Sequence, residues 1–358
     1  MAQSIGTQSM GLMKGNEAIA EAAIRAGCRA YFGYPITPQN EIPEYMAKHL
    51  PKVGGVFLQA ESELAAINMV YGAGGAGVHV MTSSSSPGIS LKQEGLSYIA
   101  CAEVPCVVVN MMRSGPGLGG ILPAQGDYFQ ATKGGGHGDY HLLVLAPSTI
   151  QEAVDLTYEA FDLARRYRNP VMILGDGLLG QMMESVTLPQ PKAPLPKPPW
   201  ATTGCGDGEP RVINSLYIQG DVMEERTKRI FAKYAKMKQN EIRFENYKTD
   251  GAKIILAAYG STARIAKTAV DKARTRGIKV GLFRPISLYP FPYDELSEVA
   301  TEAKAVLTVE MSMGQMVEDV RLAVEGRCPV RFYGRSGGIV PTPQEILQQI
   351  QAIWSHIA

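Results

Sequence analysis

The stretch from Gly55 to Gly77, GVFLQAESELAAINMVYGAGGAG, decides the fold that we expect for this chain. A short apolar run bounded by glycines, followed by apolar residues at helical spacing, predicts a buried parallel strand that leads into a helix. Glu61 and Glu63 lie at that junction, in the first turn of the predicted helix. Helix dipoles favour negative side chains there, so one interpretation is that both acids are purely structural. The alternative is a functional carboxylate.

Length and composition narrow the class of protein. The 358 residues, 45% of them hydrophobic, are enough for two or three domains with large cores. A formal net charge of +1 gives no electrostatic reason to expect nucleic acid or an anionic membrane as partner. No apolar run of about 18 residues and no basic-then-apolar leader is present, so we expect no membrane span, no signal peptide and a cytoplasmic protein. The five cysteines include no Cys-x-x-Cys pair, which argues against a disulfide framework, a zinc site or an iron–sulfur cluster held by this chain alone.

The first 190 residues have the pattern of a doubly wound parallel sheet. After a polar, glycine-punctuated start, a helix is expected from about Asn16. Thr37 followed by Pro38 has the pattern of a helix N-cap and a first-turn proline, and Ser148 with Gln151 has that of a capping box. The strands that we expect are residues 30–33, 55–58, 78–81, 104–112 and 171–174.

Polar loops follow several of these strands, and open α/β sheets bind ligands at the carboxyl ends of their strands. Ser85 lies in the run Thr-Ser-Ser-Ser-Ser-Pro-Gly at 82–88, although a serine run equally suits a flexible turn. Arg113 follows an apolar strand, and a guanidinium can hold a carboxylate by two parallel hydrogen bonds; a loop salt bridge is the alternative. His137 and Asp139 lie among glycines that permit close backbone approach to a ligand.

We expect a first domain at 1–190, a linker and insert at 191–250, and a second domain at 251–358. Residues 188–200, LPQPKAPLPKPPW, predict a semi-rigid extended linker, and the charged segment 224–246 predicts a polar helix or a mobile arm. Strands at 254–258, 279–283, 306–309 and 330–333, separated by helical stretches, predict a second parallel α/β unit.

The string Glu63-Leu64-Ala65-Ala66 resembles the Glu-x-Ala-Ala helix start in the pyrimidine domain of thiamine diphosphate enzymes. The resemblance implies that Glu63, rather than Glu61, is the catalytic and cofactor-binding carboxylate, which meets N1′ of the aminopyrimidine. A carboxyl group can do this if it is desolvated enough to hold a proton near neutral pH. The carbanion chemistry belongs to the cofactor.

The string Tyr34-Pro35-Ile36-Thr37-Pro38 is similar to a hallmark sequence of the 2-oxoacid:ferredoxin oxidoreductases. The chain resembles the alpha subunit of these enzymes. This resemblance implies that Thr37 and Arg113 bind the substrate carboxylate and that Ser85, His137 and Asp139 line the cavity. Residues 283–292, FRPISLYPFP, resemble the transketolase C-terminal type domain of the same enzymes. The expected fold is therefore α/β, a thiamine-diphosphate-type pyrimidine domain followed by a transketolase C-terminal-like α/β domain.

The pyrophosphate half of the cofactor site is missing from the sequence. Gly175-Asp176-Gly177 resembles the start of the family's metal motif, but no asparagine follows at the family's distance. The resemblance thus implies no metal ligand here and a beta subunit that carries the diphosphate and Mg²⁺ motif. It also implies gamma and ferredoxin-like delta subunits, or equivalents, with [4Fe-4S] clusters, CoA as co-substrate and ferredoxin as acceptor.

The reaction implied is oxidative decarboxylation of a 2-oxoacid to acyl-CoA, CO₂ and reduced ferredoxin. The strings at 59–63 and 130–139 are similar to those of the branched-chain, 3-methyl-2-oxobutanoate type. The cavity loops offer Met111, Met112, Leu118, Ile121 and Leu122, which suit an apolar acyl chain.

A second substrate carboxylate would need a further cation, for which only Lys92 and Lys133 are candidates. Two alternatives stay open. One is the same machinery acting on 2-oxoglutarate or pyruvate, and the other is a non-catalytic assembly subunit.

Overall fold

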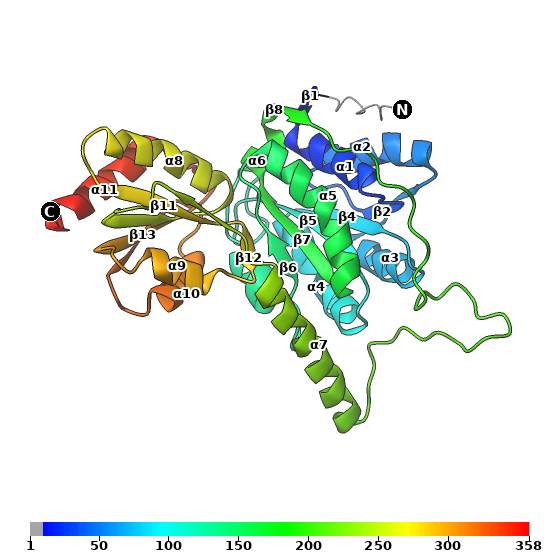
Figure 1. Ribbon diagram of the computed structural model, residues 1–358. Coiled ribbons are helices and arrows are strands. Elements are labelled where there is room, and N and C mark those ends of the chain that lie inside the picture. Colours follow the sequence, from blue (N-terminus) through cyan, green and yellow to red (C-terminus); the bar gives the residue numbers. More distant parts are fainter. Residues whose placement is uncertain (1–9, 358) are drawn as a thin grey trace, which may run out of the picture.

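Two α/β units follow one another in the computed structural model, which describes residues 10–357 (Figure 1). The first unit contains β1 (Met10–Lys14), α1 (Gly15–Arg25), β2 (Ala30–Gly33), α2 (Glu41–His49), β3 (Val56–Gln59), α3 (Glu63–Gly75), β4 (Val80–Ser84), α4 (Ser86–Cys101), β5 (Cys106–Met112), β6 (Leu143–Leu145), α5 (Ile150–Tyr167), β7 (Pro170–Asp176), α6 (Gly177–Gln181) and β8 (Met183–Thr187). Helix α7 (Gly220–Asn240) connects the units. The second contains β9 (Phe244–Tyr247), β10 (Ile254–Ala257), α8 (Gly260–Arg274), β11 (Val280–Pro285), β12 (Ser287–Tyr289), α9 (Tyr293–Val299), β13 (Ala305–Glu310), α10 (Met316–Val324), β14 (Val330–Gly334) and α11 (Pro343–Ile357).

The first sheet has the order β12-β6-β7-β5-β4-β2-β3, and every strand except β12 is parallel to its neighbours. Every residue of β5 is buried, because helices cover both faces of the sheet. Side chains alternate along the strand: Val107 and Val109 pack in the core with α1 and α5, whereas Val108 and Met112 pack in the core with α3 and α4. The doubly wound sheet predicted from the sequence is therefore confirmed.

The second sheet has the order β14-β13-β10-β11-β9, with only β9 antiparallel. Helices α8 and α11 pack on one face, and α9 and α10 contribute to the core on the other. Strand β9 lies inside the range that we expected to be insert, and β12 comes from the second domain range yet pairs antiparallel with β6 of the first sheet. The domain boundaries at 190 and 250 stay a prediction.

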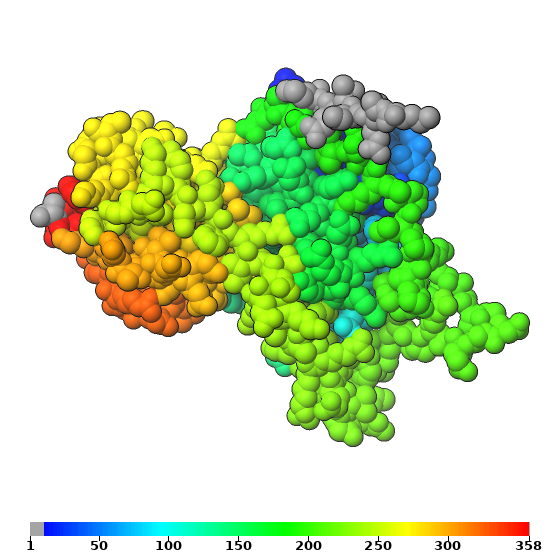
Figure 2. All heavy atoms as spheres, in the orientation of Figure 1, coloured from blue at the N-terminus to red at the C-terminus, as the bar shows by residue number. Residues whose placement is uncertain are grey.

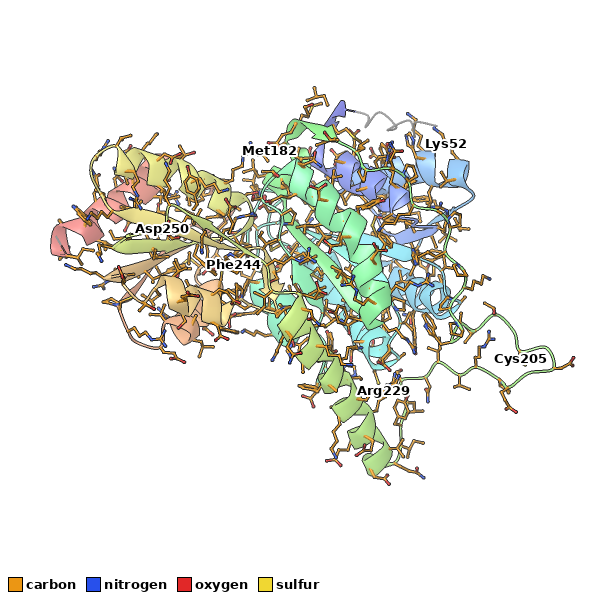
Figure 3. The ribbon with its side chains drawn as sticks, viewed as in Figure 1. Lys52, Met182, Cys205, Arg229, Phe244 and Asp250 are labelled. Atoms are coloured by element: carbon orange, nitrogen blue, oxygen red, sulfur yellow. The ribbon has the colours of Figure 1, made fainter. Side chains whose placement is uncertain are left out.

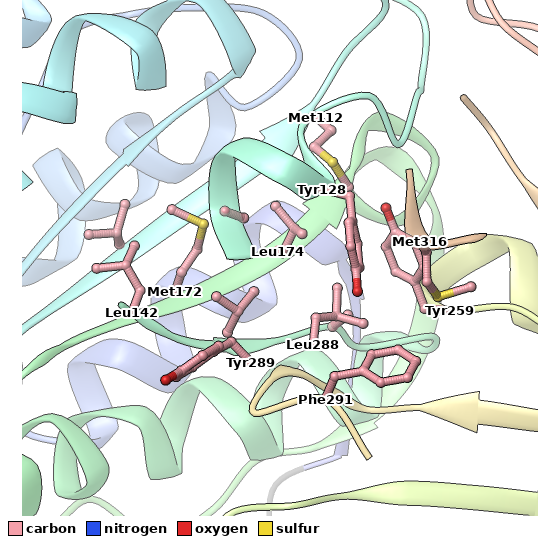
Figure 4. Close-up of a cluster of buried hydrophobic side chains, with 14 of the residues drawn as sticks. Met112, Tyr128, Leu142, Met172, Leu174, Tyr259, Leu288, Tyr289, Phe291 and Met316 are labelled. Carbon is pink, nitrogen blue, oxygen red and sulfur yellow. The ribbon is translucent and has the colours of Figure 1, made fainter. Parts of the chain in front are cut away.

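A single hydrophobic core runs from the first unit into the second (Figure 4). Tyr128 packs against Tyr259 with ring centroids 5.7 Å apart, and its hydroxyl donates a hydrogen bond to Asp319. Gln125 donates a hydrogen bond to the carbonyl of Tyr259 at 3.0 Å and accepts one from Thr262 at 2.7 Å. The two units are thus held against each other by apolar packing and by satisfied buried polar groups.

Four local predictions were wrong. Strand β3 lies at the sheet edge with Val56 and Leu58 exposed, so it is not a buried strand. The Thr37–Pro38 pair does not start a helix, because α2 begins only at Glu41. Residues 82–84 extend β4 instead of forming a loop. The cap of α5 is Thr149, one residue after the predicted Ser148, and its hydroxyl accepts from the backbone N–H of Glu152 at 3.1 Å.

The segment around residue 205 projects from the body of the molecule, with Cys205 near its tip (Figures 2 and 3). The charged segment that follows it contains α7, so a helix and not a mobile arm forms there. Buried Glu103 anchors this helix through ion pairs with Arg226 and Arg229 at 2.9 Å and Lys233 at 3.6 Å. Among the residues that the structure describes, no helix is both long and apolar enough to span a membrane.

Arg284 forms the main ionic link between the units. It is 2% exposed, and its guanidinium donates two hydrogen bonds to Glu152 of α5 and one to Glu245 of β9. Burial alone would raise the pKa of Glu152, but the hydrogen bond and charge of Arg284 outweigh it and hold this pKa below its ordinary value.

The Arg284→Met variant is expected to lower the free energy of unfolding by about 2 kcal/mol. Removing one partner of a buried pair costs about 3 to 5 kcal/mol, and the partial exposure of both carboxylates reduces that figure. Urea unfolding of the purified chain measures the loss. The matched control is Arg264→Met, because the Arg264–Glu184 pair is exposed and its loss should cost less than about 1 kcal/mol. Equal losses in the two variants would contradict this account.

Candidate active site

Glu63 is the first residue of α3 and is 6% exposed. Ser62 caps the helix, since its hydroxyl accepts a hydrogen bond from the backbone N–H of Ala65 at 3.1 Å. The carboxylate of Glu63 makes no hydrogen bond with any residue that the structure describes. Glu61 is exposed, so burial as well as spacing distinguishes the two acids. A buried carboxylate without a partner in its own chain suits a ligand that supplies the missing hydrogen bond.

Gly88 of α4 makes room for this carboxylate. A Cβ atom at Gly88 would lie 2.6 Å from Oε1 of Glu63 and 2.1 Å from the hydroxyl oxygen of Ser84. Both contacts are much shorter than normal packing distances, so a side chain at residue 88 would have to displace the Ser84 hydroxyl or the Glu63 carboxylate. The glycine that follows the serine run, Gly88, therefore leaves space for the Glu63 carboxylate at the candidate site.

Arg113 follows β5 and is 8% exposed. Its guanidinium donates hydrogen bonds to the carbonyl oxygens of Thr37 at 2.9 Å and Leu118 at 3.0 Å, while Nε is buried without a partner in the described chain. Thr37 itself is exposed. The structure thus brings Thr37 and Arg113 into contact, as the sequence led us to expect, and leaves the guanidinium with unused donor capacity.

A cavity of about 500 Å³ lies between the two units. Arg113, Ser86 and Asp127 line it from the first unit, and Met311, Ser312 and Gln315 line it from the second. The predicted lining residues Met111 and Met112 are instead fully buried in the core of β5, because a strand buried on both faces sends neither side chain to its end. The cavity therefore depends on the docking of the second unit.

Sequence reasoning missed Asp127 and Ser86. The hydroxyl of Ser86 donates to Oδ2 of Asp127 at 2.6 Å, and the amide of Asn110 donates to the same oxygen at 2.9 Å. Burial raises the pKa of Asp127, and these two hydrogen bonds oppose the rise. No motif marks Asp127 in the sequence; the only signal was its position in a glycine-containing loop after a strand.

Ser85, which the sequence favoured, lies at the N-cap of α4 with its hydroxyl fully buried and without a partner in the described chain. His137 and Asp139 are exposed and line a separate hollow of about 130 Å³ beside residues of α7. The structure does not bring these two residues to the Arg113 cavity, and a role for all three in binding substrate stays a prediction.

Asp176 lies in the Gly-Asp-Gly string that resembles the start of a metal motif, but in the structure its carboxylate has a structural role. Its carboxylate accepts hydrogen bonds from the backbone N–H groups of Leu178 at 2.9 Å and Leu179 at 3.1 Å, and so caps α6. No group of three or more metal-ligating side chains that could hold an ion is found within residues 10–357.

Two family models match the chain. Residues 21–210 match the model described as pyruvate flavodoxin/ferredoxin oxidoreductase, thiamine diphosphate-binding, and residues 252–346 match pyruvate:ferredoxin oxidoreductase core domain II. The parallel α/β fold and the match over residues 21–210 together define an α/β protein of the thiamine diphosphate-binding type. The chain belongs to the pyruvate flavodoxin/ferredoxin oxidoreductase family, a family of oxidoreductases.

Named relatives match this chain over nearly its whole length. The ketoisovalerate oxidoreductase subunit VorB of Methanothermobacter thermautotrophicus is 49% identical over 343 residues, which cover 96% of this chain and 97% of the relative. The 2-oxoglutarate synthase subunit KorA of Methanocaldococcus jannaschii is 38% identical over 93% of this chain and 97% of the relative. Both relatives are named as subunits of larger enzymes.

Solved structures agree with this placement. The 2-oxoglutarate:ferredoxin oxidoreductase from Magnetococcus marinus, with 2-oxoglutarate, coenzyme A and succinyl-CoA bound, superimposes with a TM-score of 0.84 at 28% identity. The match covers 96% of this chain but 65% of that one, so this chain spans about two thirds of the structure that it resembles. A split-gene transketolase matches with a TM-score of 0.57 at 13% identity, a likeness of fold alone.

Gly88→Ala is expected to lower the free energy of unfolding by about 1 to 3 kcal/mol, because the new methyl group must displace Glu63 or Ser84. The matched control is Gly72→Ala on α3, where a Cβ would meet nothing within 4 Å. Replacing a glycine inside a helix should stabilise the chain by about 0.5 to 1 kcal/mol. Urea unfolding of both variants provides the comparison, and a neutral Gly88→Ala would show that the site is looser than described.

Proposed function

We propose that this chain is the alpha subunit of a thiamine diphosphate-dependent 2-oxoacid:ferredoxin oxidoreductase. Such an enzyme converts a 2-oxoacid and CoA to acyl-CoA and CO₂, with reduction of ferredoxin. The observation that carries the proposal is the buried carboxylate of Glu63, which has no partner in the described chain and lies in the region that matches a thiamine diphosphate-binding family model.

The residues around Glu63 fit the aminopyrimidine half of thiamine diphosphate. The carboxylate is free to share a proton with N1′, and Gly88 lets it lie close against α4 without steric conflict. When bound, the cofactor supplies the carbanion that attacks the substrate carbonyl. Glu63 holds the shared proton at N1′, and the capped helix fixes the position of its side chain.

Arg113 and Thr37 are proposed to hold the carboxylate of the substrate. The guanidinium is largely desolvated, which strengthens its attraction for an anion, and its unpartnered Nε is a donor that the chain leaves available. Thr37 is exposed, and its backbone carbonyl accepts a hydrogen bond from this guanidinium. Ser85, His137 and Asp139 are retained as candidate cavity residues on the resemblance alone.

The remaining parts of the enzyme are assigned to partner subunits. A beta subunit is proposed to bind the diphosphate and Mg²⁺, and gamma and ferredoxin-like delta subunits to carry [4Fe-4S] clusters. In support, large apolar side chains are exposed on β3, α3 and α4, the elements that precede, contain and pack against Glu63: Val56, Leu58, Leu64 and Leu91. Exposed apolar side chains gathered around a site are typical of a protein interface. With ferredoxin as acceptor, we place the enzyme in the cytoplasm.

A branched-chain 2-oxoacid is the proposed substrate. The fully buried amine of Lys92 donates a hydrogen bond to the backbone carbonyl of Glu63 and does not line the 500 Å³ cavity, and Lys133 forms an ion pair with Asp319 at 2.5 Å. Neither lysine faces the cavity as a partner for a second carboxylate, whereas Met311 and Met313 do line it. The 49% identity to a ketoisovalerate oxidoreductase subunit, against 38% to a 2-oxoglutarate synthase subunit, agrees with this choice.

Two alternatives are less favoured. The same machinery acting on 2-oxoglutarate has support from the KorA relatives and the Magnetococcus marinus structure. A non-catalytic assembly subunit would have no use for a buried carboxylate that has no hydrogen-bond partner among the described residues, because such a group destabilises the fold unless a ligand satisfies it.

Glu63→Gln in the assembled, cofactor-loaded complex is expected to slow exchange of the thiazolium C2 proton by about 10² or more, the usual contribution of an acid–base group. The amide keeps the size of the side chain but cannot share the proton. Proton exchange followed by NMR after quenching measures the rate. Glu61→Gln is the control, because this neighbouring acid is exposed and its loss should leave the rate unchanged. The opposite pattern would move the role to Glu61.

On the assembled complex, kcat/KM for 3-methyl-2-oxobutanoate is expected to exceed that for 2-oxoglutarate by at least about a hundredfold. The reason is that an unpaired second carboxylate in the cavity costs several kcal/mol. For related branched 2-oxoacids, the free energy that sets kcat/KM should differ by only about 1 to 3 kcal/mol per methylene group. The enzyme should therefore accept several of these acids as substrates. A preference for 2-oxoglutarate would overturn the substrate assignment and leave the role of Glu63 intact.

A further inference from the structure

Lys92 is a buried cation with no role in the chemistry described so far. It lies in α4 and has no exposed surface. Its ammonium donates one hydrogen bond, at 3.4 Å, to the backbone carbonyl of Glu63, and makes no other within residues 10–357. Lysine is almost never fully buried unless it is paired, because desolvation of the ammonium is costly. If this position had only a structural role, an apolar residue would stabilise the fold better than lysine.

The packing of α3 against α4 holds this amine where it is. Gly88, Lys92 and Gly95 lie four and three residues apart and so share one face of α4. Gly88 lies against the carboxylate of Glu63, and a Cβ at Gly95 would be only 2.5 Å from Ile67 of α3. Lys92 lies between these two close contacts and cannot turn out to solvent without separating the helices.

Electrostatics links Lys92 to Glu63. Burial lowers the pKa of Lys92 from its ordinary value of 10.5 to about 8, and the negative charge of Glu63 opposes the fall. The positive end of the α3 dipole adds to the cost of an ammonium under its first turn. Two other acids have hydrogen-bond donors of their own: Asp127 accepts from Ser86 and Asn110, and Glu94 of α4 accepts from Tyr98 at the surface. Glu63 is therefore the counter-charge of Lys92.

We propose that Lys92 is a positioning residue for Glu63, whose negative charge it stabilises so that the shared proton moves from the carboxyl oxygen of Glu63 to N1′ of the bound cofactor. The O–H bond breaks as the N–H bond forms, and the positive charge of Lys92 stabilises the carboxylate that remains. The inference rests on the proposed function of Glu63. It predicts that the stabilisation weakens as Lys92 loses its own proton above about pH 8.

The first test is the pH profile of C2 proton exchange in the cofactor-loaded complex. Lys92→Met keeps the length of the side chain and removes its charge, so protonation of Glu63 becomes easier. The acid limb of the profile should move to higher pH by roughly 1 to 3 units, the usual effect of an adjacent charge, and any limb near pH 8 should vanish. A merely structural lysine would leave both limbs in place.

The second test needs no cofactor and measures unfolding of the full chain against pH. Because the pKa of Lys92 is lower in the folded chain than its ordinary 10.5, the unfolded chain binds more protons between about pH 8 and 10.5. The contribution of Lys92 to the free energy of unfolding therefore rises with pH across this window. Lys92→Met should abolish that rise, and Glu63→Gln, which removes the counter-charge, should make it begin at lower pH.

Controls separate the two hypotheses. Lys52→Met removes an exposed lysine and should match the wild type in both profiles. Lys92→Gln is a second neutral variant in case Lys92→Met does not fold. If Glu63→Gln leaves exchange unchanged, the proposed function fails. If Glu63→Gln stops exchange but neither neutral variant at Lys92 shifts a profile, the inference about Lys92 is overturned and the proposed function stands.

Discussion

The close packing of α3 on α4 is the constraint on which the site depends. Because residue 88 has no side chain, the carboxylate of Glu63 lies directly against α4, where it is 6% exposed. Desolvation makes that carboxylate sensitive to any neighbouring charge, since Coulomb interactions strengthen as water is excluded. The ammonium of Lys92, one turn further along α4, donates a hydrogen bond to the backbone carbonyl of this same residue.

A second consequence of the fold is that neither α/β unit contains the cavity alone. Strand β12 leaves the second unit to pair with β6, and Gln125 and Tyr128 bind the second unit from the first. Arg113 and Asp127 therefore face Met311 and Ser312 across a space that neither unit would enclose separately. Clefts between packed units are frequent ligand sites, because they bury a small molecule without opening either core.

The edge of the first sheet explains why the chain is proposed to work with partners. Strand β3 exposes Val56 and Leu58 at an unpaired sheet edge, and exposed apolar edge strands invite association. Glu63 follows directly after this strand. A subunit that covered the edge would also close the site, which is consistent with relatives that are named as subunits.

Local sequence determined the class of fold and, through a family resemblance, singled out Glu63 as the proposed catalytic acid. Hydrophobic periodicity predicted most strands to within two residues, since backbone geometry fixes the repeat of buried positions. The Glu-x-Ala-Ala string selected Glu63 over Glu61, a choice that burial now supports. Tertiary structure decided the rest. The exposure of β3, the burial of Met111 and Met112, the partnership of Asp127 with Ser86, and the inward position of Lys92 all depend on contacts between segments far apart in the chain. Periodicity reports which side of an element is apolar, but it does not report which other element covers that side.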